Sequence, residues 1–104
     1  MRDMKEPNQS IRLFEKQGET SIFIDVEIDK EGDLILSGQD LGKAPEEYWG
    51  ASDYEYMMHV KRDQMNTLLL SLIKEKFGGN AQAFANFREY LIKESIPYEF
   101  GSWV

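Results

Sequence analysis

The sequence predicts an α+β domain in which a four-stranded antiparallel meander is followed by two helices packed on one face of the sheet, a two-layer ββββαα arrangement. Two observations support this fold class. Apolar and polar residues alternate through the first half of the chain, as in strands that are buried on one side only. After Val60 the apolar residues recur instead at the spacing of amphipathic helices.

Four segments are predicted strands because their side chains alternate between two faces. Residues 11–16 form a short first strand, and residues 21–29 alternate strictly, with branched aliphatic side chains on one face. Gly32 suits a positive φ in the tight connection to the third strand, residues 34–39. Residues 53–60 form the fourth strand, in which two tyrosines, a methionine and a valine share one face.

The segment PEEYWG, residues 45–50, has the pattern of a single helical turn between the last two strands. It begins with a proline, carries two glutamates in its first turn and ends with a glycine. Tyr48 and Trp49 then either cover the end of the core or serve as anchors for a partner, since both residue types are enriched at interface hot spots.

The second half of the chain predicts two helices. Apolar residues from Met65 to Phe77 recur at helical spacing, and two glycines follow at 78–79 as a stop signal. Asn80 suits the cap of a second helix, which is expected to end before Pro97.

Length and composition limit the remaining possibilities. With 104 residues, we expect a flexible N-terminus over residues 1–10 and a single α+β domain over residues 11–104. The sequence holds no cysteine, which excludes disulfides, thiolate nucleophiles and cysteine metal sites. It also shows no apolar signal region and no apolar stretch of about 20 residues, so we expect a cytoplasmic protein.

The formal net charge of −7 is concentrated in the first half of the chain. Between Glu19 and Glu55 there are eleven acidic residues and two lysines. Such a surface repels phosphate backbones and anionic lipid, which disfavours nucleic acid and membranes as partners. The acidic residues serve either solubility alone or the recognition of a basic protein.

The stretches DLILSGQDLG, DYEYMMHV and IPYEFGSW together resemble a group of small, uncharacterised bacterial proteins. The resemblance covers roughly residues 11–103. Some members of that group look like immunity or partner-binding proteins. The resemblance therefore implies a bacterial origin and a binding role, and it brings no catalytic residues with it.

Three carboxylates at the two ends of the segment between the third and fourth strands are candidates for a metal site. Asp40, Asp53 and Glu55 offer oxygen ligands for a hard cation, but their order lacks calcium-loop spacing. An Asx turn at Asp40 explains that residue better. His59, the only histidine, lies ~13 Å along the strand from Glu55, the nearest same-face acid in sequence. We therefore expect no metal, no cofactor and no catalytic residue; a small metal-dependent ligand binder or enzyme that uses these four residues is the weakest alternative.

The predicted binding surface is the face of the sheet that points away from the helices, together with the acidic loop from Asp40 to Glu55. If the first hairpin pairs Lys16 with Ser21, Phe14 lies opposite Phe23 on that face. The leading hypothesis is a non-catalytic, immunity-like module for a basic protein partner, and the alternative is a homodimer that associates through this open face. The candidate partner-binding residues are Phe14, Phe23, Asp25, Glu27, Ile35, Asp40, Trp49, Asp53, Glu55 and Met57.

Overall fold

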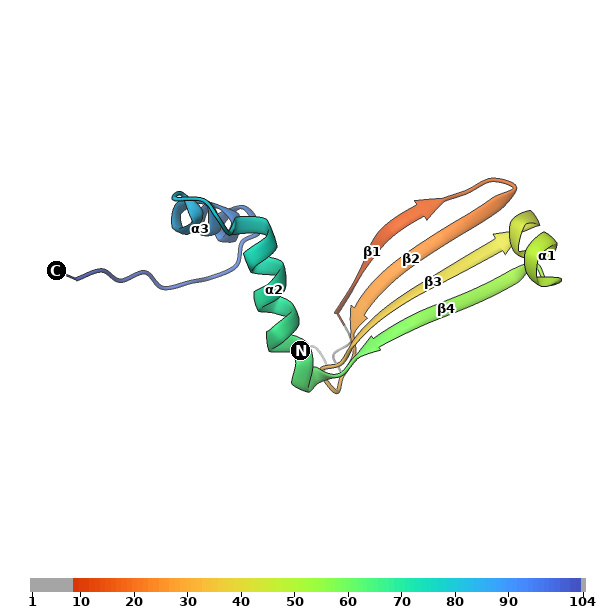
Figure 1. Cartoon of the computed structure of the whole chain (residues 1–104), viewed down its shortest axis with the longest axis horizontal. Coiled ribbons are helices and arrows are strands. Elements are labelled where there is room, and N and C mark those ends of the chain that lie inside the picture. Colours follow the sequence, from red (N-terminus) through yellow and green to blue (C-terminus); the bar gives the residue numbers. More distant parts are fainter. Residues whose placement is uncertain (1–8, 104) are drawn as a thin grey trace, which may run out of the picture. The chain divides into compact units, whose positions relative to one another are not determined.

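The computed structural model describes residues 9–103, which divide into two compact units, one ending at Asn66 and one beginning at Thr67. The elements, labelled in Figure 1, are β1 (Gln9–Lys16), β2 (Thr20–Ile28), β3 (Leu34–Gly42), α1 (Lys43–Trp49), β4 (Asp53–Val60), the 3₁₀ turn η1 (Arg62–Gln64), α2 (Met65–Phe77) and α3 (Ala83–Lys93). This order confirms the α+β class with a meander sheet followed by helices.

Two finer predictions about the fold are neither confirmed nor contradicted by the structure. The packing of the helices on the sheet and the single domain over residues 11–104 stay predictions. Most of the predicted flexible N-terminus lies outside the described residues. Gln9 and Ser10, which it included, belong to β1.

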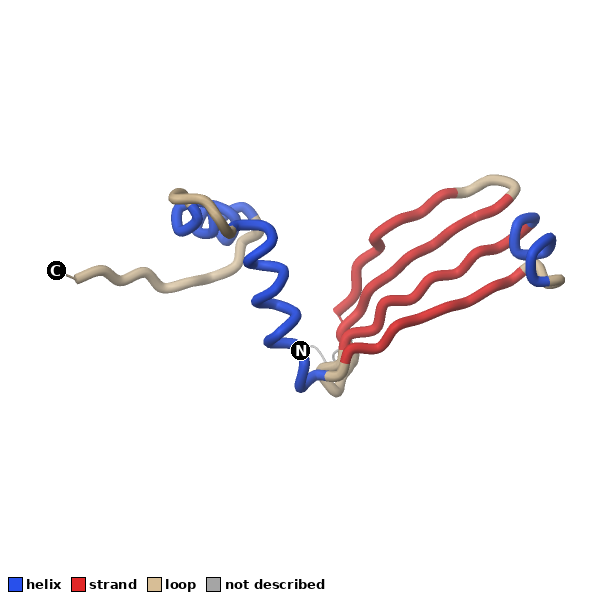
Figure 2. Tube along the Cα trace, viewed as in Figure 1, coloured by secondary structure: helices blue, strands red, loops and turns tan. Residues whose placement is uncertain are grey.

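The sheet has the order β1-β2-β3-β4, and each strand is antiparallel to its neighbours (Figure 2). Because side chains alternate across a strand, the pairing defines two faces. The apolar face carries Ile11, Phe14, Ile22, Ile24, Val26, Leu34, Leu36, Tyr54, Tyr56, Met58 and Val60. The polar face carries Arg12, Glu15, Phe23, Asp25, Glu27, Ile35, Ser37, Gln39, Asp53, Glu55, Met57 and His59.

A β-bulge in β1 corrects the predicted register of the first hairpin. Arg12 pairs with Asp25 as expected, but the register shifts before Phe14, which pairs with Ile24 rather than with Phe23. A bulge inserts one extra residue, here Leu13, and so interrupts the alternation of side chains. Phe14 thereby joins the apolar face, opposite Ile24. The prediction that Phe14 lies on the open face is wrong for this reason.

Helix α1 confirms the predicted helical turn and starts two residues earlier, at Lys43. It lies at the end of the sheet where β3 leads into β4 (Figure 1). The Ala44 N–H donates to Thr20 Oγ1 at 2.9 Å, which ties the first turn of the helix to β2. At the other end Trp49 stacks on Tyr54 with ring centroids 4.9 Å apart.

Gly38 is set directly opposite Tyr56 across β3 and β4. A Cβ at position 38 would overlap the Tyr56 ring, so the ring lies over the glycine backbone. The Tyr56 hydroxyl donates to Asp40 Oδ1 at 2.8 Å. This contact of an aromatic ring with a cross-strand glycine explains why β3 tolerates a residue with low strand propensity at its centre.

The helical unit is held together by aromatic contacts. Phe77 at the end of α2 meets Phe87 and Tyr90 of α3 edge to face, at centroid distances of 5.2 and 5.9 Å. Asn80 accepts the Gln82 N–H at 2.7 Å in the turn before α3. No helix in the described part of the chain is both long and apolar enough to span a membrane.

The end of α3 has the hydrogen bonds of a Schellman motif. The Ile96 N–H donates to the Leu91 carbonyl at 2.9 Å, and the Ser95 N–H donates to the Ile92 carbonyl at 3.1 Å. Ser95 has φ 58°, a left-handed conformation in which a side chain is disfavoured. Pro97 follows and prevents the helix from continuing.

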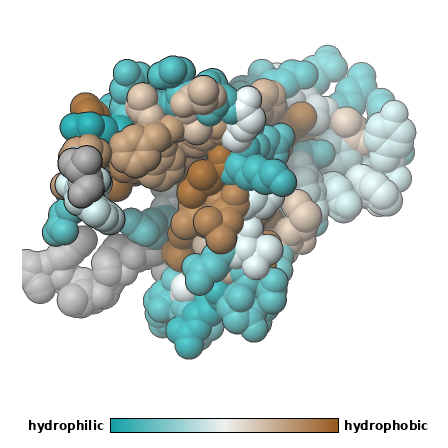
Figure 3. All heavy atoms as spheres, turned by 60° about the vertical axis from the view of Figure 1, so that its left-hand side comes forward, coloured by the Kyte–Doolittle hydropathy of each residue, from teal (hydrophilic) through white to brown (hydrophobic). Residues whose placement is uncertain are grey.

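Neither unit encloses an apolar core of its own. No aliphatic or aromatic side chain among the described residues is fully buried, and apolar side chains, brown in Figure 3, remain on the surface. In the sheet these are the apolar face and the two edge strands. In the helical unit they include leucines of α2 and Phe84 of α3. Apolar surface therefore remains accessible to solvent in both units.

Gly38→Ala should destabilise the protein by about 1–3 kcal/mol, because the added methyl group displaces the Tyr56 ring and its hydrogen bond to Asp40. Urea unfolding measures the difference. Gly18→Ala is the matched control, since its Cβ would meet only the Thr20 carbonyl oxygen at 4.0 Å. Equal effects of the two changes would contradict the close contact at Gly38.

Ser95→Gly should raise the stability of the helical unit by about 1 kcal/mol, since it relieves a side chain in the left-handed region. Thermal unfolding followed by far-UV circular dichroism measures the change. Glu94→Gly, one residue earlier at φ −90°, gains nothing of this kind and should be destabilising. A loss of stability in Ser95→Gly would contradict the left-handed assignment.

Candidate functional site

The polar face of the sheet contains a hollow of about 470 Å³. Phe23 and Asp25 of β2 and Ser37 and Gln39 of β3 form its floor, because these strands occupy the middle of the sheet. The two edge strands supply its rims, with Arg12 of β1 on one side and Glu55 of β4 on the other. We call this feature the polar-face hollow.

Arg12 is fixed on one rim by two carboxylates and a ring. Its Nε donates to Asp25, its Nη1 donates to Glu15 at 2.7 Å, and its guanidinium lies 5.1 Å from the Phe23 ring centroid. The hydrogen bond to Asp25 contributes most to raising the pKa of the guanidinium above its ordinary value. Arg12 therefore remains charged, and its charge is directed at groups of its own sheet.

Gln39 organises the opposite side of the hollow. Its Nε2 donates to Asp53 Oδ1 at 3.2 Å and to Glu55 Oε2 at 3.3 Å. One amide thus bridges two carboxylates that stand two residues apart on the same face of β4. Because each carboxylate has further lone pairs, both can still accept hydrogen bonds from an incoming cation.

The electrostatic character of the polar face is negative. Its strand residues include five carboxylates and one guanidinium, which are Glu15, Asp25, Glu27, Asp53, Glu55 and Arg12. The face also carries apolar side chains, of which Met57 is 61% exposed. Such a surface offers charge-assisted hydrogen bonds together with apolar contact area.

The structure divides the ten predicted partner-binding residues between two surfaces. Seven lie on the polar face, namely Phe23, Asp25, Glu27, Ile35, Asp53, Glu55 and Met57. Phe14 and Asp40 lie on the apolar face, and Trp49 ends α1. The ten residues therefore do not form one continuous surface.

Asp40 lies neither in its predicted turn nor beside Asp53 and Glu55. It belongs to β3, where it pairs with Ile22 and Tyr54, so it does not form a turn that ends the strand. It lies on the opposite face from Asp53 and Glu55, so the three carboxylates do not converge on one cation. Its carboxylate accepts the Tyr56 hydroxyl, and this hydrogen bond is the main cause that raises the pKa of the phenol.

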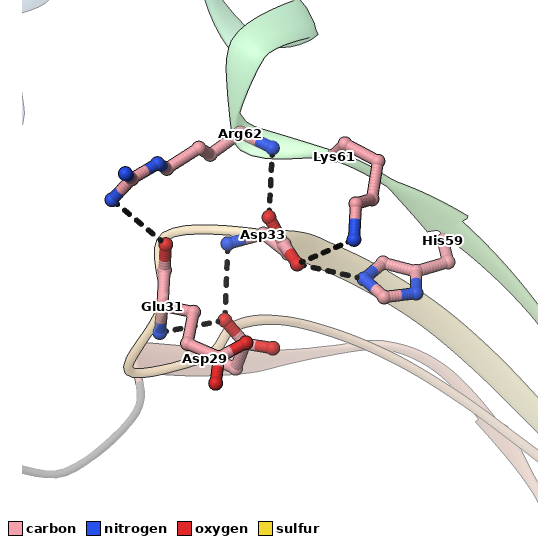
Figure 4. Close-up of polar contacts among 6 residues, drawn as sticks. All are labelled: Asp29, Glu31, Asp33, His59, Lys61 and Arg62. Carbon is pink, nitrogen blue, oxygen red and sulfur yellow. Dashed lines mark hydrogen bonds and ion pairs between the residues drawn. The ribbon is translucent and has the colours of Figure 1, made fainter.

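Asp33 is a structural centre that the sequence analysis missed (Figure 4). Asp33 is the only buried polar residue among the described residues, with 5% of its surface exposed. Its Oδ1 accepts the Arg62 backbone N–H at 2.7 Å, and its Oδ2 contacts His59 Nε2 at 3.0 Å and Lys61 Nζ at 3.8 Å. These contacts join the β2–β3 hairpin to the end of β4.

The hairpin itself positions Asp33. Asp29 Oδ1 accepts the N–H groups of Glu31 and Asp33 at 2.9 and 3.0 Å, and Gly32 has φ 88° (Figure 4). The pairing of β3 with β4 points to this cluster. Leu34 pairs with Val60, so the next position along the two strands brings Asp33 beside Lys61. The predicted strands, extended by one residue, would have indicated that pair.

The ligand-type atoms of Asp29, Asp33 and His59 lie within 4.8 Å of one another, but they are committed to the contacts described above. The ammonium of Lys61 also approaches the same carboxylate. The cluster is therefore best explained as a link between two chain segments. A cation would have to compete with positive charge that is already present.

Comparison with known proteins gave no match to a family model, to a curated protein or to a solved structure.

Asp33→Asn should destabilise the protein at neutral pH, and the difference from the wild type should shrink in acid. The hydrogen bond from the Arg62 amide is the main cause that lowers the pKa of Asp33. In the unfolded chain the Asp33 carboxyl has its ordinary pKa of about 4. Above that pH the carboxylate therefore contributes its full stabilisation to the folded protein. The stabilisation by the Asp33 carboxylate is lost as the pH falls through the lowered pKa of Asp33 in the folded protein.

Urea midpoints measured from neutral pH into acid test this linkage. Asp63→Asn is the control, because the Asp63 side chain makes no hydrogen bond within the described residues. A stability difference between Asp33→Asn and the wild type that persists unchanged in strong acid would contradict the prediction.

Proposed function

We propose that this protein is a non-catalytic binding module that takes a basic protein partner on the polar face of its sheet, in the manner of an immunity protein. The observation that supports this proposal best is the polar-face hollow, which the carboxylates of Asp25 and Glu55 line together with the ring of Phe23. Five carboxylates share this face with one guanidinium, and that guanidinium is already engaged by two of them.

The geometry suits a lysine or arginine side chain of the partner. Gln39 holds Asp53 and Glu55 beside each other, so part of the entropy cost of ordering them is met before binding. A cation that enters the hollow can donate charge-assisted hydrogen bonds to both carboxylates. Phe23 and Met57 add the apolar contacts that anchor interfaces.

The negative charge also affects how the partner arrives. Carboxylates on one face attract a basic protein over several ångströms and accelerate the encounter, and salt screens this effect. The same charge disfavours the alternative in which two polar faces pack on each other, because carboxylates would then meet carboxylates.

Gln39→Lys tests the proposal with a single change in the middle of the hollow. The new ammonium would pair with Asp53 and Glu55 and would occupy the place of the partner's cation. We expect the dissociation constant to rise about tenfold or more, which corresponds to ~1.4 kcal/mol. Gln64→Lys on η1 adds the same charge outside the hollow and is the matched control.

The partner is first captured from an extract of the cell that encodes the protein, and the purified pair is then titrated by calorimetry at two salt concentrations. Capture and tight binding by the wild type and by Gln64→Lys, with loss in Gln39→Lys at an unchanged melting temperature, would support the proposal. Equal affinity of all three proteins would refute it.

A further inference from the structure

Strand β4 is an exposed sheet edge with an uninterrupted backbone. It pairs with β3 on one side and has no strand on its other side among the described residues. Its register with β3 runs without a break from Asp53 to Val60. Met57 and Met58 in its middle are 61% and 62% exposed. Alternate N–H and C=O groups of such a strand point outward and are available to another strand.

The two edges of this sheet differ. Natural proteins protect edges with bulges, prolines or lysines, which discourage pairing with another chain. The β1 edge carries a bulge between Arg12 and Phe14. The sequence of β4, DYEYMMHV, contains no proline and no lysine, and its tyrosines and valine favour strands. The β4 edge is therefore the one suited to strand addition.

We propose that a second copy of this chain pairs with the β4 edge, antiparallel and about a two-fold axis that passes through Met57. The sheets of the two copies then join into one continuous eight-stranded sheet. The polar face continues into the polar face of the second copy, and the apolar face continues likewise. The interface is isologous, so each contact occurs twice.

Charge complementarity selects this register. A register that aligns the two faces pairs odd-numbered residues with odd-numbered ones. Centred on Met57, it sets Glu55 opposite His59 of the second copy and Asp53 opposite Lys61 of the second copy. A shift of the centre by one residue either way leaves one of the two acids without a basic residue opposite it.

The apolar face agrees with the same register. Tyr56 of each copy comes opposite Met58 of the other, and Tyr54 comes opposite Val60. Pairs of an aromatic with an aliphatic or methionine side chain are favourable across strands. Residues on both faces of β4 thus find suitable partners in one arrangement.

A cysteine at the proposed axis tests the arrangement directly, because the sequence contains no cysteine of its own. In the proposed dimer the two Met57→Cys side chains face each other within disulfide reach, and mild oxidation should crosslink nearly all of the protein. Ser37→Cys is the matched control, since Ser37 pairs with Met57 on the same face but one strand further inside. It should remain uncrosslinked.

Charge reversal supplies a second, independent test in the full-length protein. Asp53→Lys alone and Lys61→Glu alone each place like charges opposite each other twice, and each should sediment as a monomer. An equimolar mixture of the two variants restores both ion pairs and should sediment as a dimer. Circular dichroism checks that each variant is folded.

Wild-type dimers in sedimentation, crosslinking confined to Met57→Cys and recovery of the dimer in the mixture would each support the proposal. A wild type that stays monomeric up to millimolar concentration would overturn it. Equal crosslinking of Ser37→Cys and Met57→Cys would overturn it as well, because it would indicate contact between faces. The proposal would also be overturned if the equimolar mixture of Asp53→Lys and Lys61→Glu were folded but stayed monomeric.

Discussion

The buried carboxylate of Asp33 connects segments that are distant in sequence. The backbone N–H of the same residue donates to Asp29 and closes the β2–β3 hairpin, while the carboxylate accepts the Arg62 N–H where the chain leaves β4. A buried charge is tolerated only when hydrogen bonds and opposite charges compensate its desolvation, and His59 and Lys61 complete that requirement. The compensation requires β4 to lie in its observed register, since only then do these groups meet.

That register in turn determines the chemistry of both faces. With Leu34 opposite Val60, every even residue of β4 joins the apolar face, and Asp53 and Glu55 come together beside Gln39. A slip of one residue would exchange the faces and place tyrosines where the acids stand. The polar-face hollow is therefore a consequence of strand pairing, and its charge follows from the alternation of acidic and apolar residues in the sequence.

Much of the fold could be predicted because it depends on local periodicity. The alternation in β2 and β4, the turn at Gly32 and the stop after Phe77 were sufficient for the strands and helices. The bulge at Leu13 was not predictable, because the residue types of this strand do not mark where the register with β2 shifts. Asp40 was misplaced because a carboxylate before Leu-Gly fits a turn equally well, and its bond to Tyr56 arises across strands.

The proposed partner site and the proposed edge dimer share Asp53 and Glu55, so formation of the dimer would shift the charge available to a partner towards Asp25 in the floor of the hollow. Pairing of β4 edges would neutralise part of the charge of Asp53 and Glu55 along the seam. The floor of the hollow, formed by β2 and β3, would stay open on each copy, and Asp25 would keep its place there. Two hollows related by the two-fold axis would then lie on the same face of one continuous sheet. A partner that presents two basic clusters would gain affinity from both, because the second contact becomes intramolecular once the first has formed.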